Sequence, residues 1–153
     1  GIGVRGVLVD IRLAIAVRVA RPQHPEVPGL VFGLDRGGSC RGLALKVARK
    51  NAASVLGYLH DREMMNSVYL PKWLPVRLPS ENVTAYAFIA DRRHQQYTGR
   101  LDDQDAVKFI LQGRGKRGHC LNYLQNTLHH LDELGIADAP LHRLVKLAEK
   151  ASA

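Results

Sequence analysis

The N-terminal part of the chain alternates apolar and polar positions. Apolar residues occupy the odd positions from 7 to 19, and the charged residues among them fall on even positions, namely Asp10, Arg12 and Arg18. A period of two is typical of a β-strand with one buried face, so this segment is predicted to form one strand or a bent pair. We expect it to pair into a sheet, since alternation alone is enough to seat a strand. The alternative is an unpaired, aggregation-prone edge.

A β-hairpin and a short helix are predicted next. The hairpin joins strands over residues 30–34 and 41–47 through Asp35-Arg36-Gly37-Gly38, which supplies turn residues that tolerate positive φ. Asn51 is the expected cap of the helix. Glu63 falls one turn past the last apolar member of that helix, at or just beyond its end.

A second β-hairpin is predicted in the middle of the chain. Its strands cover residues 73–78 and 83–90, and Pro79-Ser80-Glu81-Asn82 forms the turn between them. Pro71 and Pro75 indicate that the first of these strands is an edge strand or a bulged strand, because proline cannot donate a ladder hydrogen bond.

The C-terminal third is predicted to be helical. Asp102 or Asp103 starts the first helix, a leucine stripe marks the second, Gly135 closes it, and Pro140 opens the last. The stripe has helical spacing and consists of Leu121, Leu124, Leu128 and Leu131. Strands first and helices last indicate an α+β fold, and we expect one domain over residues 1–153.

The composition limits the kind of protein that this chain can form. A chain of 153 residues that is 46% hydrophobic suffices for one domain with a core, and no segment approaches the ~20 apolar residues of a membrane span. Cys40 and Cys120 form no CxxC motif, which argues against a disulfide framework or a zinc site. We therefore expect a soluble cytoplasmic protein with no membrane partner.

The net charge of +8 raises the question of a nucleic-acid partner. The Lys and Arg residues are spread along the whole chain, with no tract longer than two. This distribution favours solvated basic faces, and no nucleic-acid partner is expected.

Spaced sequence blocks carry a resemblance to a known family. In chain order they are Leu30-Val31-Phe32-Gly33-Leu34-Asp35-Arg36-Gly37-Gly38-Ser39-Cys40-Arg41-Gly42, Tyr58-Leu59-His60-Asp61-Arg62-Glu63-Met64, Trp73-Leu74-Pro75-Val76-Arg77-Leu78, Ala90-Asp91-Arg92 with Tyr97-Thr98-Gly99-Arg100-Leu101, Gly113 through Gly118 with Asn122-Tyr123-Leu124, and Leu134-Gly135-Ile136. Together they resemble the bacterial glutathione-specific γ-glutamylcyclotransferases, the ChaC-like proteins. The resemblance implies a small mixed β-barrel or sheet with flanking and C-terminal helices. It also implies an enzyme that needs no cofactor and cleaves glutathione, its small-molecule substrate, by cyclising the γ-glutamyl group to 5-oxoproline and releasing Cys-Gly.

The N-terminus departs from the family pattern. The family opens on a strand and a Tyr-Gly-Ser-Leu turn that holds the substrate, whereas this chain has no tyrosine before Tyr58. Its first 21 residues use seven amino-acid types. We expect the family-like part to cover residues 25–145, with residues 1–24 atypical, as in a truncated or frame-shifted copy. The alternative function is a catalytically impaired remnant or a peptide-binding module.

Glu63 is the candidate catalytic residue. The implied reaction needs a group that takes a proton from the α-amine of the γ-glutamyl moiety and returns one to the leaving amine. A single carboxylate in a partly desolvated pocket suits both steps. Spacing alone favours a plain charged helix end at Asp61-Arg62-Glu63, and the Arg-Glu-Met match to the family pattern favours catalysis.

Tyr123 is the candidate substrate-binding residue. It lies on the side of its helix opposite the leucine stripe and matches the family tyrosine thought to contact the γ-glutamyl group. A phenol offers a hydrogen-bond donor without charge. A half-buried aromatic residue with its hydroxyl group in water is an equally good interpretation.

Two other patterns are rejected as sites. Gly113-Arg114-Gly115-Lys116-Arg117-Gly118 fits the dinucleotide fingerprint GxGxxG, but a helix is expected to end at about Gln112 where the fingerprint requires a strand. A solvated connection between helices is favoured over a loop that attracts substrate carboxylates. His129 and Glu133 are ligand types at i, i+4, but one such pair on a charged face is no metal site, and none is expected.

Overall fold

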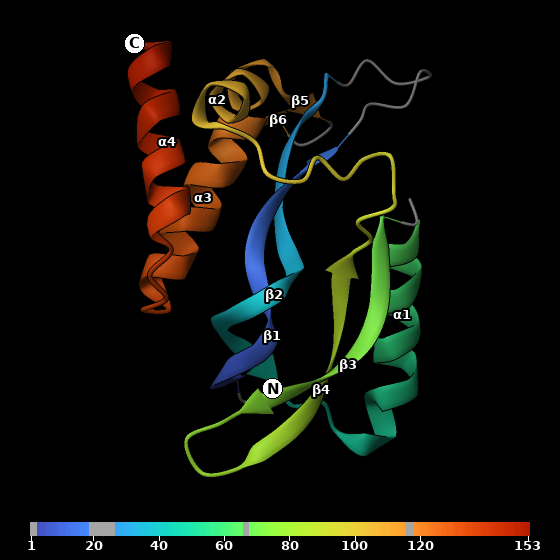
Figure 1. Cartoon of the computed structure of the whole chain (residues 1–153). Helices are drawn as coiled ribbons and strands as arrows, with labels where there is room; N and C mark the ends of the chain where they lie inside the picture. Colours follow the sequence, from blue (N-terminus) through green and yellow to red (C-terminus); the bar gives the residue numbers. More distant parts are fainter. Residues whose placement is uncertain (1–2, 19–26, 66–67, 116–117) are drawn as a thin grey trace. The chain divides into compact units, whose positions relative to one another are not determined.

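The fold is α+β, as the sequence predicts. The computed structural model describes residues 3–18, 27–65, 68–115 and 118–153 (Figure 1). The elements in chain order are β1 (Gly3–Arg18), β2 (Gly29–Leu45), the 3₁₀ turn η1 (Arg49–Asn51), α1 (Ala52–Met64), β3 (Tyr69–Arg77), β4 (Asn82–Ala90), α2 (Asp103–Gln112), β5 (Arg114–Gly115), β6 (Gly118–His119), α3 (Cys120–Glu133) and α4 (Ala139–Ser152). None of the described helices is long and apolar enough to cross a membrane.

The chain divides into two compact units, each built from two stretches of sequence. Unit 1 consists of Gly1–Ala14 and Gly33–His94, and unit 2 consists of Ile15–Phe32 and Gln95–Ala153. Strands β1 and β2 therefore each contribute residues to both units.

The sheet of unit 1 is a small closed barrel in the order β1-β2-β4-β3. It is mixed, because β2 pairs with β4 in parallel whereas β3 is antiparallel to both β1 and β4. The barrel confirms the sheet type that the family resemblance implies.

The alternating N-terminal segment forms one strand that joins the barrel. In β1, Val7 lies opposite Arg77 and Leu8 lies opposite Val76 of β3. The prediction that this segment pairs into the sheet is confirmed. Position 19 lies outside the described residues.

The first predicted hairpin is wrong. The structure has one continuous strand, β2, through Asp35-Arg36-Gly37-Gly38. Gly37 and Gly38 do take positive φ values of 92° and 115°, but the chain does not reverse there. Leu34 pairs with Ile89 of β4, and the Asp35 side chain is fully buried beside Arg92. These long-range contacts keep the chain extended through residues whose local chemistry suits a turn.

The second hairpin is confirmed. Strands β3 and β4 pair in continuous antiparallel register from Tyr69 opposite Ala90 to Arg77 opposite Asn82, without a bulge. Among the described residues, the pairing of β3 with β1 is confined to its last two positions. The two prolines of β3 therefore lie where β4 is its only described strand partner, as expected for an edge.

Helix α1 packs against the rest of unit 1 through half-buried residues. It lies alongside β3 (Figure 1), and none of its residues is fully buried. Asn51 precedes it as predicted, but its side chain makes no capping hydrogen bond. Its carbonyl oxygen instead accepts a hydrogen bond from the Ser54 hydroxyl at 3.0 Å. Glu63 lies inside the last turn rather than beyond it.

The helices of unit 2 begin and end largely as predicted. Asp102 caps α2 by accepting the backbone N–H of Asp105 at 2.8 Å, and Asp138 caps α4 in the same way through Leu141. Gly135 follows α3 with a φ of 67°. The core of unit 2 combines these helices with the start of β2, and its buried members are Leu30, Ala106, Ile110, Cys120, Leu124, Leu141, Val145 and Ala148.

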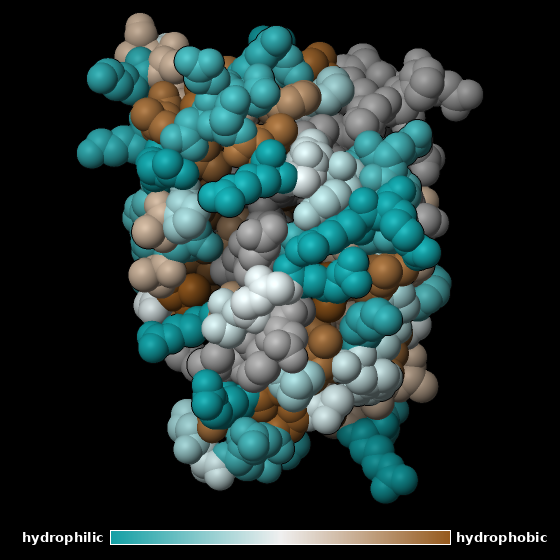
Figure 2. All heavy atoms as spheres, in the orientation of Figure 1, coloured by the Kyte–Doolittle hydropathy of each residue, from teal (hydrophilic) through white to brown (hydrophobic). Residues whose placement is uncertain are grey.

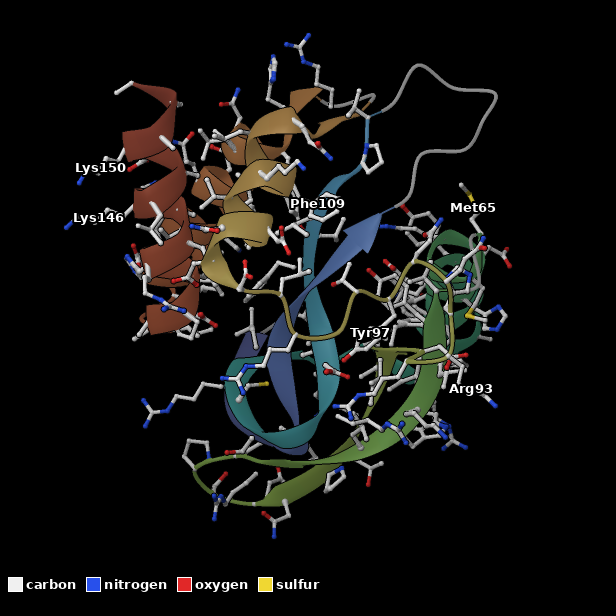
Figure 3. The ribbon with its side chains drawn as sticks, turned by 45° about the horizontal axis from the view of Figure 1, so that its top comes forward. Met65, Arg93, Tyr97, Phe109, Lys146 and Lys150 are labelled. Atoms are coloured by element: carbon white, nitrogen blue, oxygen red, sulfur yellow. The ribbon has the colours of Figure 1, made fainter. Side chains whose placement is uncertain are left out.

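Figure 2 shows hydrophilic side chains over α4 with hydrophobic ones between them. Lys146 and Lys150 project outward from this helix (Figure 3). The alternation matches an amphipathic helix with one face in the core of unit 2.

A close approach of two backbone segments fixes the start of β2 in unit 2. A Cβ atom on Gly113 would lie 2.6 Å from the Cα atom of Gly29 and 2.7 Å from the Cβ atom of Cys120. The Cys120 thiol accepts the backbone N–H of Leu30 and donates to its carbonyl, both at 3.2 Å. Cys120 is therefore a packing residue of this core.

The two cysteines are expected to differ in reactivity. Burial raises the pKa of the Cys120 thiol, whereas Cys40 is only partly buried. At pH 8, a disulfide reagent should titrate Cys40 and reach Cys120 only when denaturant is added. Because the pKa of Cys120 is higher in the folded state, its stabilising contribution is present below the unfolded value of 9.0 and is lost as the pH rises above it. A single fast phase for both thiols would contradict the assignment.

Candidate functional site

The Glu63 side chain lies on the half-buried face of α1. Its side chain is 26% exposed, while the neighbouring Asp61 and Arg62 are exposed. Leu59 and Leu56 precede it by four and seven positions and are also half-buried, so the three share one helix face. The Arg62 Nε atom lies 3.4 Å from the Glu63 Oε1 atom. A partly desolvated carboxylate beside an apolar face can exchange protons with a substrate.

Tyr123 lies on α3 with 42% of the residue exposed. Leu124, the next residue, is fully buried in the core of unit 2, so the helix presents the phenol on a different side from the leucine stripe. The Tyr123 carbonyl accepts the hydroxyl of Thr127 at 2.9 Å. Glu63 belongs to unit 1, and Tyr123 belongs to unit 2.

An ion pair in unit 1 was not predicted from the sequence. The Arg92 Nε atom lies 2.9 Å from Asp35 Oδ1, and its Nη2 atom lies 3.1 Å from Asp35 Oδ2. Asp35 is the one buried charged residue among those from position 27 onward whose burial the structure describes. The available signal was an aspartate directly after the apolar run of residues 30–34, because a buried carboxylate requires a cationic or hydrogen-bonding partner.

The glycine-rich segment is a connection between helices. Helix α2 ends at Gln112, and the short strands β5 and β6 pair with each other before α3 begins. The strand that a dinucleotide fingerprint requires is replaced by a helix, as predicted. Lys116 and Arg117 lie outside the described residues.

The histidine-rich end of α3 lies at the surface. Glu133 approaches His129 at 3.4 Å and His130 at 3.6 Å, and all three side chains are exposed by 60% or more. In the part of the chain that the structure describes, no group of three histidine, cysteine, aspartate or glutamate residues is placed to hold a metal ion.

Two shallow grooves flank α4 in unit 2. One, of about 500 Å³, lies between α2 and α4 beside Val107 and Leu147. The other lies between α3 and α4 beside Leu128 and His142. Neither is lined by Glu63 or Tyr123.

Sequence comparison finds similarity to relatives named as glutathione-specific enzymes. Over 147 residues the chain is 31% identical to the glutathione-specific γ-glutamylcyclotransferase of Escherichia coli. The aligned region covers 95% of this chain and 64% of the relative. The chain is 33% identical over 104 residues to glutathione-specific γ-glutamylcyclotransferase 1 of Mus musculus, covering 65% of this chain and 47% of the relative. The chain thus spans less than two thirds of the length of these relatives.

Structural comparison gives the same fold. A crystal structure of a γ-glutamyl cyclotransferase specific to glutathione from yeast matches with a TM-score of 0.82 at 14% identity, over 98% of this chain and 88% of that one. At this identity the match supports the fold alone.

The model of the ChaC-like protein family matches residues 12–151. The match starts upstream of residue 25, where the sequence blocks had placed the beginning of the resemblance, and it includes much of β1. The chain therefore belongs to the ChaC-like family.

Proposed function

We propose that this protein is a glutathione-specific γ-glutamylcyclotransferase. The observation that carries the proposal is the placement of Glu63, the residue that matches the family's Arg-Glu-Met block, on the half-buried side of α1. The family match over residues 12–151 supports the same reaction class. No cofactor is needed, since the reaction is an internal acyl transfer.

Proton movement is the chemical problem that Glu63 would solve. The α-amine of glutathione is an ammonium ion at neutral pH and is not nucleophilic. Glu63 takes its proton, the free amine attacks the γ-carbonyl carbon of the same molecule, and a five-membered lactam closes. The carbon–nitrogen bond to cysteine then breaks, and Glu63 returns the proton to the leaving amine. The attacking nitrogen also loses a second proton, which passes to the same amine, so that Cys-Gly leaves as an ammonium ion. Proton transfer of this kind contributes about 10²–10⁴-fold, and the intramolecular geometry adds the effect of proximity.

Tyr123 is proposed to contact the γ-glutamyl group. Its partial exposure leaves the phenol available as an uncharged hydrogen-bond donor. The expected setting is the cytoplasm, because free cysteines such as Cys40 and Cys120 are typical of a reducing compartment.

The proposal predicts that the chain converts glutathione into equal amounts of 5-oxoproline and Cys-Gly. Both products are measured by chromatography after incubation with the purified protein. γ-Glutamyl-alanine, which lacks the Cys-Gly portion, is the specificity control and should react poorly. A folded protein that releases no 5-oxoproline would contradict the proposal and support the alternative of an impaired remnant.

A further inference from the structure

Asp35 is a fully buried carboxylate in unit 1. Its hydrogen-bond donors include two nitrogen atoms of the Arg92 guanidinium and the backbone N–H of Arg36 at 2.8 Å. Arg92 Nη2 also donates to the carbonyl of Arg36. These contacts join the turn after β4 to the middle of β2, across 57 residues of sequence.

The turn that carries Arg92 is closed on itself. The Asp91 carboxylate accepts the backbone N–H of Arg93 at 3.0 Å, and the Asp91 carbonyl accepts the N–H of His94 at 3.0 Å. The backbone hydrogen bond from Arg93, followed by that from its side chain, lowers the pKa of Asp91. The turn is therefore preformed at neutral pH, and the Arg92 side chain leaves it in a defined direction.

The same turn is tied to the segment that follows the candidate catalytic helix. The Asp91 N–H donates to the carbonyl of Val68 at 2.8 Å. Val68 is only 5% exposed and lies five positions after Glu63. The residues around position 91 thus bridge β2 on one side and Val68, four positions after the last residue of α1, on the other.

Helix α1 packs through half-buried residues. None of its residues is fully buried, and the hydrogen bonds of a last helical turn fray readily when tertiary packing is weak. An anchor just beyond the helix therefore has a large influence on where its last turn lies.

The Asp35 side chain is 1% exposed and the Arg92 side chain is 37% exposed, so the pair buries the carboxylate and leaves part of the guanidinium in water. Desolvation of the carboxylate offsets much of the attraction. The best-attested use of such a pair is to specify one arrangement among several. We propose that Arg92, held by Asp35, is a positioning residue that fixes the C-terminal turn of α1, and with it Glu63, for the cyclisation reaction. This inference rests on the proposed function of Glu63.

The test compares three variants of the full chain. Arg92→Ala removes the guanidinium, Arg92→Lys keeps the charge but not the bidentate geometry, and Arg93→Ala is the matched control. Arg93 lies in the same turn with its side chain 84% exposed, at the margin of unit 1 (Figure 3). Removing it deletes the same charge and its ion pair with Asp91 on the exposed side of the turn. The Asp35 pair and the backbone hydrogen bonds of the turn remain intact.

Two measurements are made on each variant. Amide hydrogen exchange reports on Asp91 and on the last turn of α1, with the opposite end of the β3–β4 hairpin at Val76 and Val83 as internal reference. Kinetics with glutathione separate kcat from KM. For Arg92→Ala we expect exchange at least about tenfold faster in the last turn of α1 but not at the reference. We also expect kcat to fall by about 10–10²-fold, with KM changed less than about threefold. Arg92→Lys should be intermediate and Arg93→Ala close to the parent.

Unchanged exchange in α1, equal acceleration at the reference amides, or a kcat within about twofold of the parent would overturn the inference. If Arg92→Ala does not fold, the Arg92→Lys variant decides by the same criteria. If the parent itself releases no 5-oxoproline, the proposed function fails while the exchange data still decide whether Arg92 positions the helix.

Discussion

Replacing Glu63 with glutamine is expected to lower turnover of glutathione by about 10²-fold or more while leaving the fold intact. Glutamine keeps the size of the side chain and its hydrogen-bonding capacity but cannot accept the proton of the substrate amine. The side chain is partly exposed and lies in the last turn of α1, so the substitution should cost little stability. Steady-state release of 5-oxoproline measures the effect, and circular dichroism checks the fold.

Asp61→Asn is the matched control for this experiment. Asp61 lies on the same helix two residues earlier and is exposed, so the variant removes an equal charge from the solvated side. Its activity should stay within about twofold of the parent, as expected of a surface substitution. Activity of Glu63→Gln within about threefold of the parent would contradict the assignment of Glu63 as the catalytic residue.

Replacing Gly113 with alanine is expected to destabilise the protein by about 2–3 kcal/mol. The added Cβ atom would meet the Cα atom of Gly29 at 2.6 Å, the Cβ atom of Cys120 at 2.7 Å and the carbonyl oxygen of Phe109 at 2.9 Å. All three are backbone or backbone-attached atoms, so no flexible side-chain end can move aside. The φ of Gly113 is −62°, which alanine adopts readily, and the cost is therefore steric. Urea unfolding followed by circular dichroism measures it.

Gly115→Ala separates this contact from a general effect of glycine. Gly115 belongs to the same glycine-rich segment, yet its added Cβ atom would meet nothing within 4 Å. Its stability should change by less than about 0.5 kcal/mol. Equal losses for the two variants would argue that loop flexibility, and not the approach to Gly29, sets the cost.

The helices of unit 2 could be predicted because their signals are local. The leucine stripe, Asp102 at the start of α2, Pro140 at the start of α4 and Gly135 after α3 each act within a few residues of where they lie. The existence of α1 was predicted from a local signal of the same kind. Local chemistry and local structure agree in these segments, so sequence periodicity is sufficient.

The path of β2 could not be predicted because it depends on residues far away in sequence. Asp35 and the glycines after it suit a turn, and only the contact with Arg92, 57 positions later, makes an extended strand with a buried carboxylate favourable. The role of Cys120 is equally non-local, since its thiol bonds to Leu30, 90 positions earlier. A single sequence does not show which distant residues meet, so such contacts override the local prediction.

The division into two units, each drawn from two stretches of sequence, bears on how this protein can exchange parts with its relatives. A single genetic crossover near position 94 would transfer residues 95–153 but leave residues 15–32 of unit 2 with the other parent. The resulting chimera would combine a β2 start and a helical core that were not selected together, with Leu30 facing an unfamiliar partner at position 120. Recombination that preserves unit 2 therefore needs several crossovers in one event, and we expect natural and engineered hybrids of this family to inherit the two units together.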